Sequence, residues 1–165
     1  MLMKIKNFIF NIIYILISIY LLIFIPSIFG YKPLVVLSGS MEPTLNVGGI
    51  LYYHQIELDE FKKNDIIVYQ TKNHIISHRN IMKTSDGYIT KGDNNNAVDS
   101  SLVKNEQILG KGTNWSIPLI GYYADFIYNH KYILFISVSI VIIDLINDSY
   151  ILRKKRVGNK IEKQE

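Results

Sequence analysis

Two long apolar segments lie near the ends of the chain, and a polar middle segment separates them. Residues 8–25 consist almost entirely of Ile, Leu, Phe and Tyr, and no charge occurs from Asn7 to Tyr31. A helix rises about 1.5 Å per residue, so residues 8–25 would span about 27 Å, close to the thickness of the hydrocarbon core of a bilayer. We therefore expect residues 1–31 to form a short cytoplasmic tail and a transmembrane anchor.

A cleaved secretory signal peptide is the alternative for this first segment, because Lys4 and Lys6 would supply its positively charged start. The apolar run is longer than the usual core of such a peptide. Ser27 is small, but Phe29 stands where a second small residue would be needed for cleavage. An uncleaved anchor is the preferred interpretation.

The second apolar segment, residues 131–152, is also a candidate span. It begins with uncharged residues up to Ile143 and then contains Asp144 and Asp148. A charged carboxylate at the centre of a membrane helix costs about 2.5–3.5 kcal/mol. A buried core helix, or one lying in the membrane interface, therefore remains the alternative.

The basic run that follows, residues 153–156, favours a span because positive charge accumulates on the cytoplasmic side of membrane helices. Residues 153–165 would then be a basic cytoplasmic tail, like the N-terminal one. Residues 32–130 would form an extracytoplasmic domain. The expected location is the cell membrane, or the endoplasmic reticulum (ER) membrane in a eukaryote.

The net charge of +4 is distributed unevenly, because the positive excess lies on the two tails and residues 7–152 are net negative. This distribution argues against a nucleic-acid-binding face. The chain has no cysteine, which excludes a disulfide scaffold, a thiol nucleophile and a cysteine-built metal site.

The middle segment has the pattern of a mostly β domain. Short runs of β-branched and aromatic residues alternate with turn-prone Gly, Asn, Asp and Lys, as is typical of strands joined by tight turns. The runs are residues 50–53, 66–69, 74–76 and 87–90. We expect small sheets or a partly open barrel, preceded by the N-terminal transmembrane helix and followed by a probable C-terminal one.

Residues with useful chemistry concentrate in three places in this domain: Ser40 on a Gly-flanked turn, His78 at the end of an apolar run, and Asp93 and Asp99 in a polar loop. Each alone has an ordinary structural interpretation. Together they supply a nucleophile, a base and a carboxylate to orient the base, which is the composition of a serine hydrolase triad. A calcium site is not expected in the loop, because Ala97 and Val98 stand where an oxygen ligand and a glycine would be needed.

Three segments carry a resemblance to a known family: the Ser-Gly-Ser-Met-Glu-Pro run that starts at Ser38, the Ser-His-Arg run around His78, and the Lys-Gly-Asp-Asn-Asn run that starts at Lys91. In this order behind an N-terminal anchor, they resemble the ER-type branch of type I signal peptidases. This branch includes the catalytic subunit of the eukaryotic complex and its archaeal and sporulating-bacterial relatives. The resemblance covers roughly residues 8–121.

The resemblance implies roles for individual residues. Ser40 would be the nucleophile and His78 the general base, where the bacterial branch uses a lysine; imidazole titrates near neutral pH and suits this role. Asp99 is the first choice for the third member and Asp93 the reserve. Ser38 is either a donor to an oxyanion hole or an ordinary turn serine.

Other residues could also serve as the base. His54 lies in a tyrosine-rich run and His74 at a turn, and both rank below His78. A Ser-Lys dyad would use Lys83 or Lys91, and it ranks below the Ser-His pairing.

The resemblance also implies the activity. The enzyme would remove N-terminal signal peptides after small-x-small sites through an acyl-enzyme on Ser40, with no metal and no cofactor. Its partners would be signal-peptide-bearing preproteins and the lipid bilayer, with other membrane subunits or the translocon as further candidates and no nucleic acid. The alternatives are an accessory protein with an incomplete triad, and a serine peptidase for another membrane-proximal substrate.

Overall fold

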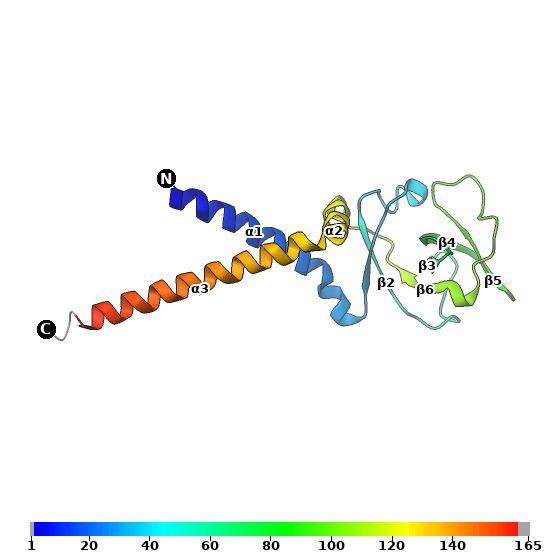
Figure 1. Cartoon of the computed structure of the whole chain (residues 1–165). Helices are drawn as coiled ribbons and strands as arrows, with labels where there is room; N and C mark the ends of the chain where they lie inside the picture. Colours follow the sequence, from blue (N-terminus) through cyan, green and yellow to red (C-terminus); the bar gives the residue numbers. More distant parts are fainter. Residues whose placement is uncertain (1, 162–165) are drawn as a thin grey trace. The chain divides into compact units, whose positions relative to one another are not determined.

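The computed structural model describes residues 2–161, and its central element is a six-stranded sheet with the order β1-β2-β6-β3-β4-β5 (Figure 1). All neighbouring strands are antiparallel. The strands are β1 (Lys32–Val35), β2 (Ile50–His54), β3 (Ile66–Gln70), β4 (Ile75–Thr84), β5 (Gly87–Lys91) and β6 (Ile108–Gly112). The predicted mostly β fold class is confirmed, and the sheet is open with β1 and β5 at its edges.

Two strands, β1 and β6, lie outside the four predicted runs. β1 contains Pro33, which an edge strand tolerates because one side of it needs no hydrogen-bond donors. β6 contains Gly110 and Gly112, which lower the strand signal, yet it occupies a central position. A side chain at Gly110, whose φ is +154°, would collide with the carbonyl oxygen of His54 on β2, so close strand approach requires glycine there.

Strand β3 is buried on both faces, which explains its continuous apolar sequence from Ile66 to Tyr69. One face belongs to a cluster with Val36, Met41, Leu45 and Leu51. The other face belongs to a cluster with Phe61, Tyr88 and Val103. The sheet therefore has an apolar core on each side.

The chain divides into two compact units, residues 22–126 and residues 1–21 with 127–165. The sheet belongs to the first unit, together with the end of α1 (Leu2–Phe24), the short 3₁₀ helix η1 (Ile25–Phe29) and the start of α2 (Ile120–Asn129). There the hydroxyl of Tyr52 donates to the carbonyl oxygen of Ile23 at 3.1 Å. The helix α2 was not foreseen, and it lies within the segment that was interpreted as the β domain.

The second unit contains most of α1 and the helix α3 (Lys131–Ile161). Two helical segments, Lys4–Phe29 and Lys131–Lys154, are long and apolar enough to cross a bilayer. α3 continues beyond Leu152, where the apolar segment was expected to end, and residues 162–165 of the predicted tail lie outside the described residues.

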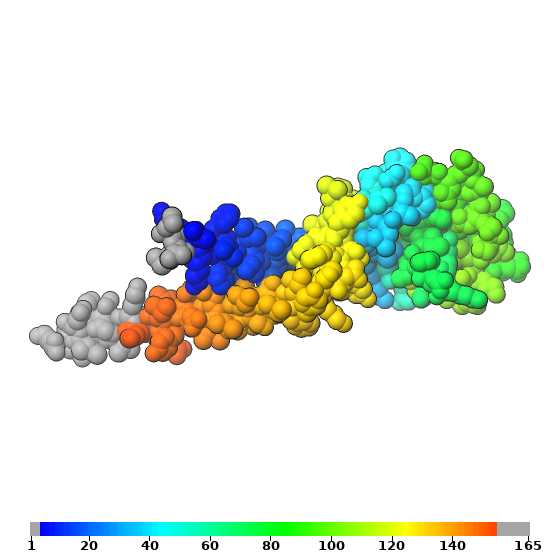
Figure 2. All heavy atoms as spheres, turned by 45° about the horizontal axis from the view of Figure 1, so that its top comes forward, coloured from blue at the N-terminus to red at the C-terminus, as the bar shows by residue number. Residues whose placement is uncertain are grey.

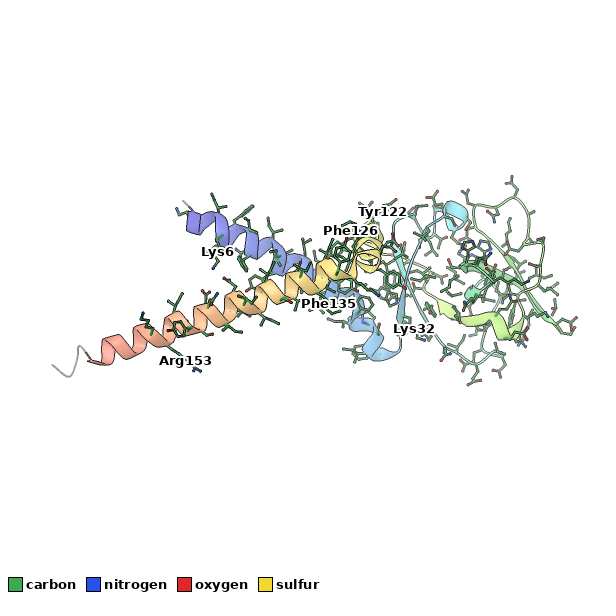
Figure 3. The ribbon with its side chains drawn as sticks, in the orientation of Figure 1. Lys6, Lys32, Tyr122, Phe126, Phe135 and Arg153 are labelled. Atoms are coloured by element: carbon green, nitrogen blue, oxygen red, sulfur yellow. The ribbon has the colours of Figure 1, made fainter. Side chains whose placement is uncertain are left out.

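An ion pair joins the two helices within this unit. The Lys6 ammonium lies 2.5 Å from Oδ1 of Asp144, and the Asp144 side chain is only 13% exposed. Figure 3 labels Lys6 on α1, and Figure 2 shows the N-terminal helix in blue beside the orange residues of α3. Lys6 is therefore the charge partner of the Asp144 carboxylate in this apolar segment.

Candidate active site

Ser40 is at the centre of a single 3₁₀ turn, η2 (Gly39–Met41), that follows strand β1. Ser38 and Glu42, on either side of the turn, have extended backbones, so the 3₁₀ conformation is confined to this single turn. Its neighbour Met41 is 1% exposed and packs in the apolar core. Burial of Met41 thus fixes the turn, while the adjacent Ser40 is only partly buried.

His78 projects from β4, where side chains alternate between the two faces of the sheet. Its strand partner is Ile67 of β3, and its side chain is 10% exposed. Nε2 of His78 lies 3.1 Å from the Ser40 hydroxyl oxygen. The imidazole is therefore within hydrogen-bonding distance of the serine that precedes it by 38 residues.

Asp99 is the third residue in the hydrogen-bonded series that begins with Ser40 and His78. Its Oδ2 atom lies 2.6 Å from Nδ1 of His78. Because a carboxylate oxygen only accepts hydrogen bonds, Nδ1 carries the imidazole proton and Nε2 is left as the acceptor for the Ser40 hydroxyl. This is the tautomer in which an imidazole can take a proton from a serine.

The loop between β5 and Asp99 also holds the turn that carries Ser40. The backbone N–H of Asn94 donates to the Ser40 carbonyl oxygen at 2.8 Å. The Asn94 side chain donates to the carbonyl oxygen of Gly39 at 3.2 Å. One short segment therefore positions both the serine turn and the carboxylate.

Asp93 accepts hydrogen bonds from residues other than His78. Arg79 donates to it with Nε and Nη2, both at 2.6 Å, and the hydroxyl of Thr44 donates at 2.6 Å. These hydrogen bonds, that from Arg79 above all, hold the pKa of the Asp93 carboxyl below its ordinary value, and Asp93 in turn raises the pKa of Arg79. Arg79 follows His78 directly and so faces the opposite side of β4. Of the two candidate carboxylates, the structure brings Asp99 to the imidazole.

Ser38 lies beside Ser40, with 3.3 Å between the two hydroxyl oxygens. The other candidate bases have separate contacts. The His54 ring packs on Tyr31 with 4.6 Å between ring centroids, and the His74 amide donates to Thr71 at 3.1 Å in the turn before β4.

The lysine candidates lie on the hairpin of β4 and β5. The ammonium of Lys83 donates to the Leu58 carbonyl oxygen at 3.1 Å, and Lys91 lies opposite Arg79 in the strand pairing. Across residues 2–161, no group of three or more His, Asp or Glu side chains could hold a metal ion.

Two hydroxyl groups at the site were not foreseen from the sequence. Thr90 donates to Oδ2 of Asp99 at 2.6 Å, and Tyr69 donates to the same oxygen at 3.3 Å. Burial raises the pKa of Tyr69 to about 12, so its phenol remains a donor across the physiological range. Alternation along β3 and β5 places both residues on the His78 face, but only the three-dimensional pairing shows that they meet Asp99.

A serine hydroxyl, an imidazole and a carboxylate in hydrogen-bonded series form the kind of site that serine hydrolases use to cleave acyl bonds. The sequence profile described as "Signal peptidase, peptidase S26" matches residues 9–105 of this chain. The chain belongs to this signal peptidase family, and the prediction of a serine peptidase of this kind is confirmed at the level of the family.

Individual relatives agree with the family match. Signal peptidase I W of Bacillus subtilis is 36% identical over 128 residues, which cover 69% of this chain and 67% of that protein. The signal peptidase complex catalytic subunit sec11 of Sclerotinia sclerotiorum is 35% identical over 113 residues, or 60% of this chain and 65% of the relative. The SEC11 subunit of Colletotrichum graminicola is 36% identical over 102 residues, or 53% and 59%. The chain thus spans about two thirds or less of the length of these relatives, which support the predicted ER-type branch.

Proposed function

We propose that this protein removes N-terminal signal peptides from preproteins at the membrane surface, with Ser40, His78 and Asp99 as its catalytic triad. The observation that carries the proposal is the continuous series from the Ser40 hydroxyl through His78 to Asp99, at 3.1 Å and 2.6 Å. Membership of the signal peptidase family supplies the substrate class.

The chemistry follows from the tautomer. Ser40 Oγ attacks the scissile carbonyl carbon while its proton passes to Nε2 of His78, and Asp99 stabilises the imidazolium that forms. Nε2 then gives this proton to the leaving amine as the C–N bond breaks, which leaves an acyl-enzyme on Ser40. A water molecule deprotonated by His78 hydrolyses the ester and restores the serine.

The oxyanion of each tetrahedral intermediate needs donors in a fixed position. The Ser40 backbone N–H and the Ser38 hydroxyl are our assignments for this role. Ser38 supports it by its closeness to the nucleophile, 3.3 Å between the two hydroxyl oxygens. Loss of one such donor typically costs about 2.7–4 kcal/mol of transition-state stabilisation.

The substrate would bind as an extended peptide. Strand β1 has a sheet neighbour on one side only, β2, and the chain continues from β1 into the turn that holds Ser40. A peptide added along such an edge pairs its backbone with the strand and alternates its side chains between two sides, which suits selection for small residues at alternate positions.

The proposed topology places residues 32–130 on the extracytoplasmic side and both tails in the cytoplasm. The two apolar helical segments and the basic residues after Leu152 support this arrangement through the positive-inside rule. Because Ser40 follows the first apolar segment closely in the sequence, the signal peptide would then emerge from the bilayer near this residue. Because relatives are named as subunits of a signal peptidase complex, other membrane subunits are proposed as partners.

The test is cleavage of a preprotein with an Ala-x-Ala site by membranes that contain the wild-type chain, Ser40→Ala or His78→Ala. We expect cleavage at that site by the wild type and loss in both variants. If the isolated wild type is inactive, the same comparison in native membranes tests whether other subunits are needed. Undiminished cleavage by Ser40→Ala would overturn the proposed mechanism.

A further inference from the structure

A single carboxylate oxygen, Oδ2 of Asp99, collects three hydrogen-bond donors. These are Nδ1–H of His78 at 2.6 Å, the hydroxyl of Thr90 at 2.6 Å and the hydroxyl of Tyr69 at 3.3 Å. The proposed reaction uses only the first of them. The proposed reaction does not explain why the hydroxyls of Thr90 and Tyr69 also bind this oxygen.

Thr90 holds Asp99 at two points. Besides the hydroxyl contact, its carbonyl oxygen accepts the backbone N–H of Asp99 at 2.8 Å. Thr90 is completely buried within β5. The Asp99 backbone and side chain are thus both tied to a residue of the rigid sheet, although Asp99 itself lies in a loop.

Tyr69 reaches the same oxygen from strand β3. Its ring is buried in the core cluster of Phe61 and Tyr88, and it lies edge-on to the His78 ring with 6.4 Å between centroids. The raised pKa of Tyr69, about 12, keeps its proton available for donation.

We propose that Thr90 and Tyr69 are positioning residues of the active site, which fix Oδ2 of Asp99 against His78 and set how strongly the carboxylate holds the imidazolium. This inference rests on the proposed function for its kinetic consequences. Preorganised sites depend on such supporting hydrogen bonds, because a loosely held carboxylate would orient the base in only part of the population.

The direction of the effect follows from charge. Two hydroxyl donors neutralise part of the negative charge on Oδ2, so removing one leaves more of it for His78. The imidazolium then becomes more stable, and the acidic limb of the pH–rate profile moves to higher pH. Asp93 also acts on His78 through its charge, and it is paired with Arg79, whose side chain lies on the opposite side of β4. Neither of these residues is altered by the substitutions.

The experiment uses the full chain in detergent micelles and compares Thr90→Val, Thr90→Ser and Tyr69→Phe with the wild type. We expect Thr90→Val to lower kcat about tenfold with little change in KM, and to move the acidic limb up by a few tenths of a pH unit. Thr90→Ser should restore most of the activity. Tyr69→Phe should act in the same direction but more weakly, because its hydrogen bond is longer.

Matched controls come from the same hairpin and the same core. The hydroxyl of Thr84 donates to the Gly87 carbonyl oxygen at 2.9 Å, and that of Tyr88 donates to the Leu58 carbonyl oxygen. Thr84→Val and Tyr88→Phe therefore remove comparable hydroxyls that do not reach Asp99. Both should leave the pH profile of kcat unchanged.

A second measurement needs no substrate. In histidine-labelled protein, the proton on Nδ1 of His78 gives an NMR resonance that reports its hydrogen bond to Asp99. It should move in Thr90→Val and Tyr69→Phe but not in the two controls. If the wild type cleaves no preprotein even in native membranes, the proposed function fails and this resonance alone decides the positioning role. An unchanged resonance and pH profile in both Thr90→Val and Tyr69→Phe would overturn the inference.

Discussion

Gly92 lies so close to Ser40 that a β-carbon at Gly92 would come 2.5 Å from the Ser40 carbonyl oxygen. That distance is far inside van der Waals contact, and backbone atoms cannot give way as a flexible side chain can. The glycine of the Lys-Gly-Asp-Asn segment therefore has a steric function, which is to let this segment pass directly against the turn that carries Ser40.

Substitution Gly92→Ala should push the turn away from His78 and lower kcat by about 100-fold, the typical cost of a misplacement near 1 Å. KM should change much less. Gly112→Ala is the control, because a methyl group there meets side-chain carbons of Ile66, Leu51 and Val68 instead of the active site. It should lower the Tm while the folded fraction keeps its kcat. Equal kcat for the Gly92→Ala variant and the wild type would contradict this steric role.

Substitution of Asp99 and substitution of Asp93 should have clearly different effects on kcat. Asp99→Asn is expected to lower kcat by about 10³–10⁴, since an amide in place of the carboxylate no longer selects the Nδ1–H tautomer. Asp93→Asn should cost far less kcat at neutral pH, because Asp93 binds Arg79 and Thr44. Steady-state cleavage assays on both variants make the comparison, and a larger loss for Asp93→Asn would exchange the two assignments.

The pairing of Asp93 with Arg79 should appear in the pH dependence of stability. The pKa of Asp93 is lowered in the folded protein, so its stabilisation is fully present above the unfolded value, about 3.9, and is lost as the pH falls through the folded value. Asp93→Asn should therefore lower the free energy of unfolding by about 2 kcal/mol at pH 7. The difference from wild type should shrink below about pH 4. Denaturation at pH 7, 5 and 3 measures it, and a difference that stayed constant across this range would count against the ion pair.

The ion pair between Lys6 and Asp144 can be tested by exchanging its charges. Lys6→Asp alone should reduce the amount of stably inserted protein, because it places two carboxylates together in an apolar environment. The double variant Lys6→Asp with Asp144→Lys should recover it. Lys4→Asp, two residues away, is the charge-matched control. Immunoblots of the membrane fraction give the result, and no recovery in the double variant would mean that the pair does not join the helices.

The absence of cysteine makes the topology simple to map. Asp59 is exposed in a turn of the sheet domain, and Lys154 is exposed near the end of α3. A membrane-impermeant maleimide should label Asp59→Cys in intact cells and Lys154→Cys only after lysis, if both tails are cytoplasmic. Wild type serves as the unlabelled control. Labelling of Lys154→Cys in intact cells would mean that this end of α3 lies on the extracytoplasmic side.

The features that sequence predicted well are those encoded locally. The apolar segments and the strand-like runs around Ile66 and Ile50 depend on composition and alternation, and both appear in the structure. β6 and α2 were missed for opposite reasons. The glycines of β6 weaken the sequence signal of a central strand, and the residues of α2 were assigned to the end of the β domain.

The choice between Asp99 and Asp93 could not be made from spacing. It depends on the path of the loop after β5, which returns so that the Asp99 amide meets the Thr90 carbonyl oxygen. The sequence did hint at the role of Asp93. Arg79 follows His78 on a strand, so its side chain lies on the opposite face, where a carboxylate such as Asp93 could pair with it. The three hydrogen-bond donors to Asp99 come from three separate strands, so no local sequence pattern could predict that they lie together.

The position of β6 has a consequence for how the protein is made. β6 lies between β2 and β3, although it is the last strand of the sheet to be synthesised. Until residue 112 has left the ribosome, β2 and β3 have no strand to join them, and the hairpin that carries His78 cannot be fixed against the turn that carries Ser40. Pairings this distant in sequence form slowly. The nascent protease should therefore remain inactive until nearly all of its sheet domain has been translated, which would keep it from cutting polypeptides beside it during its own biogenesis.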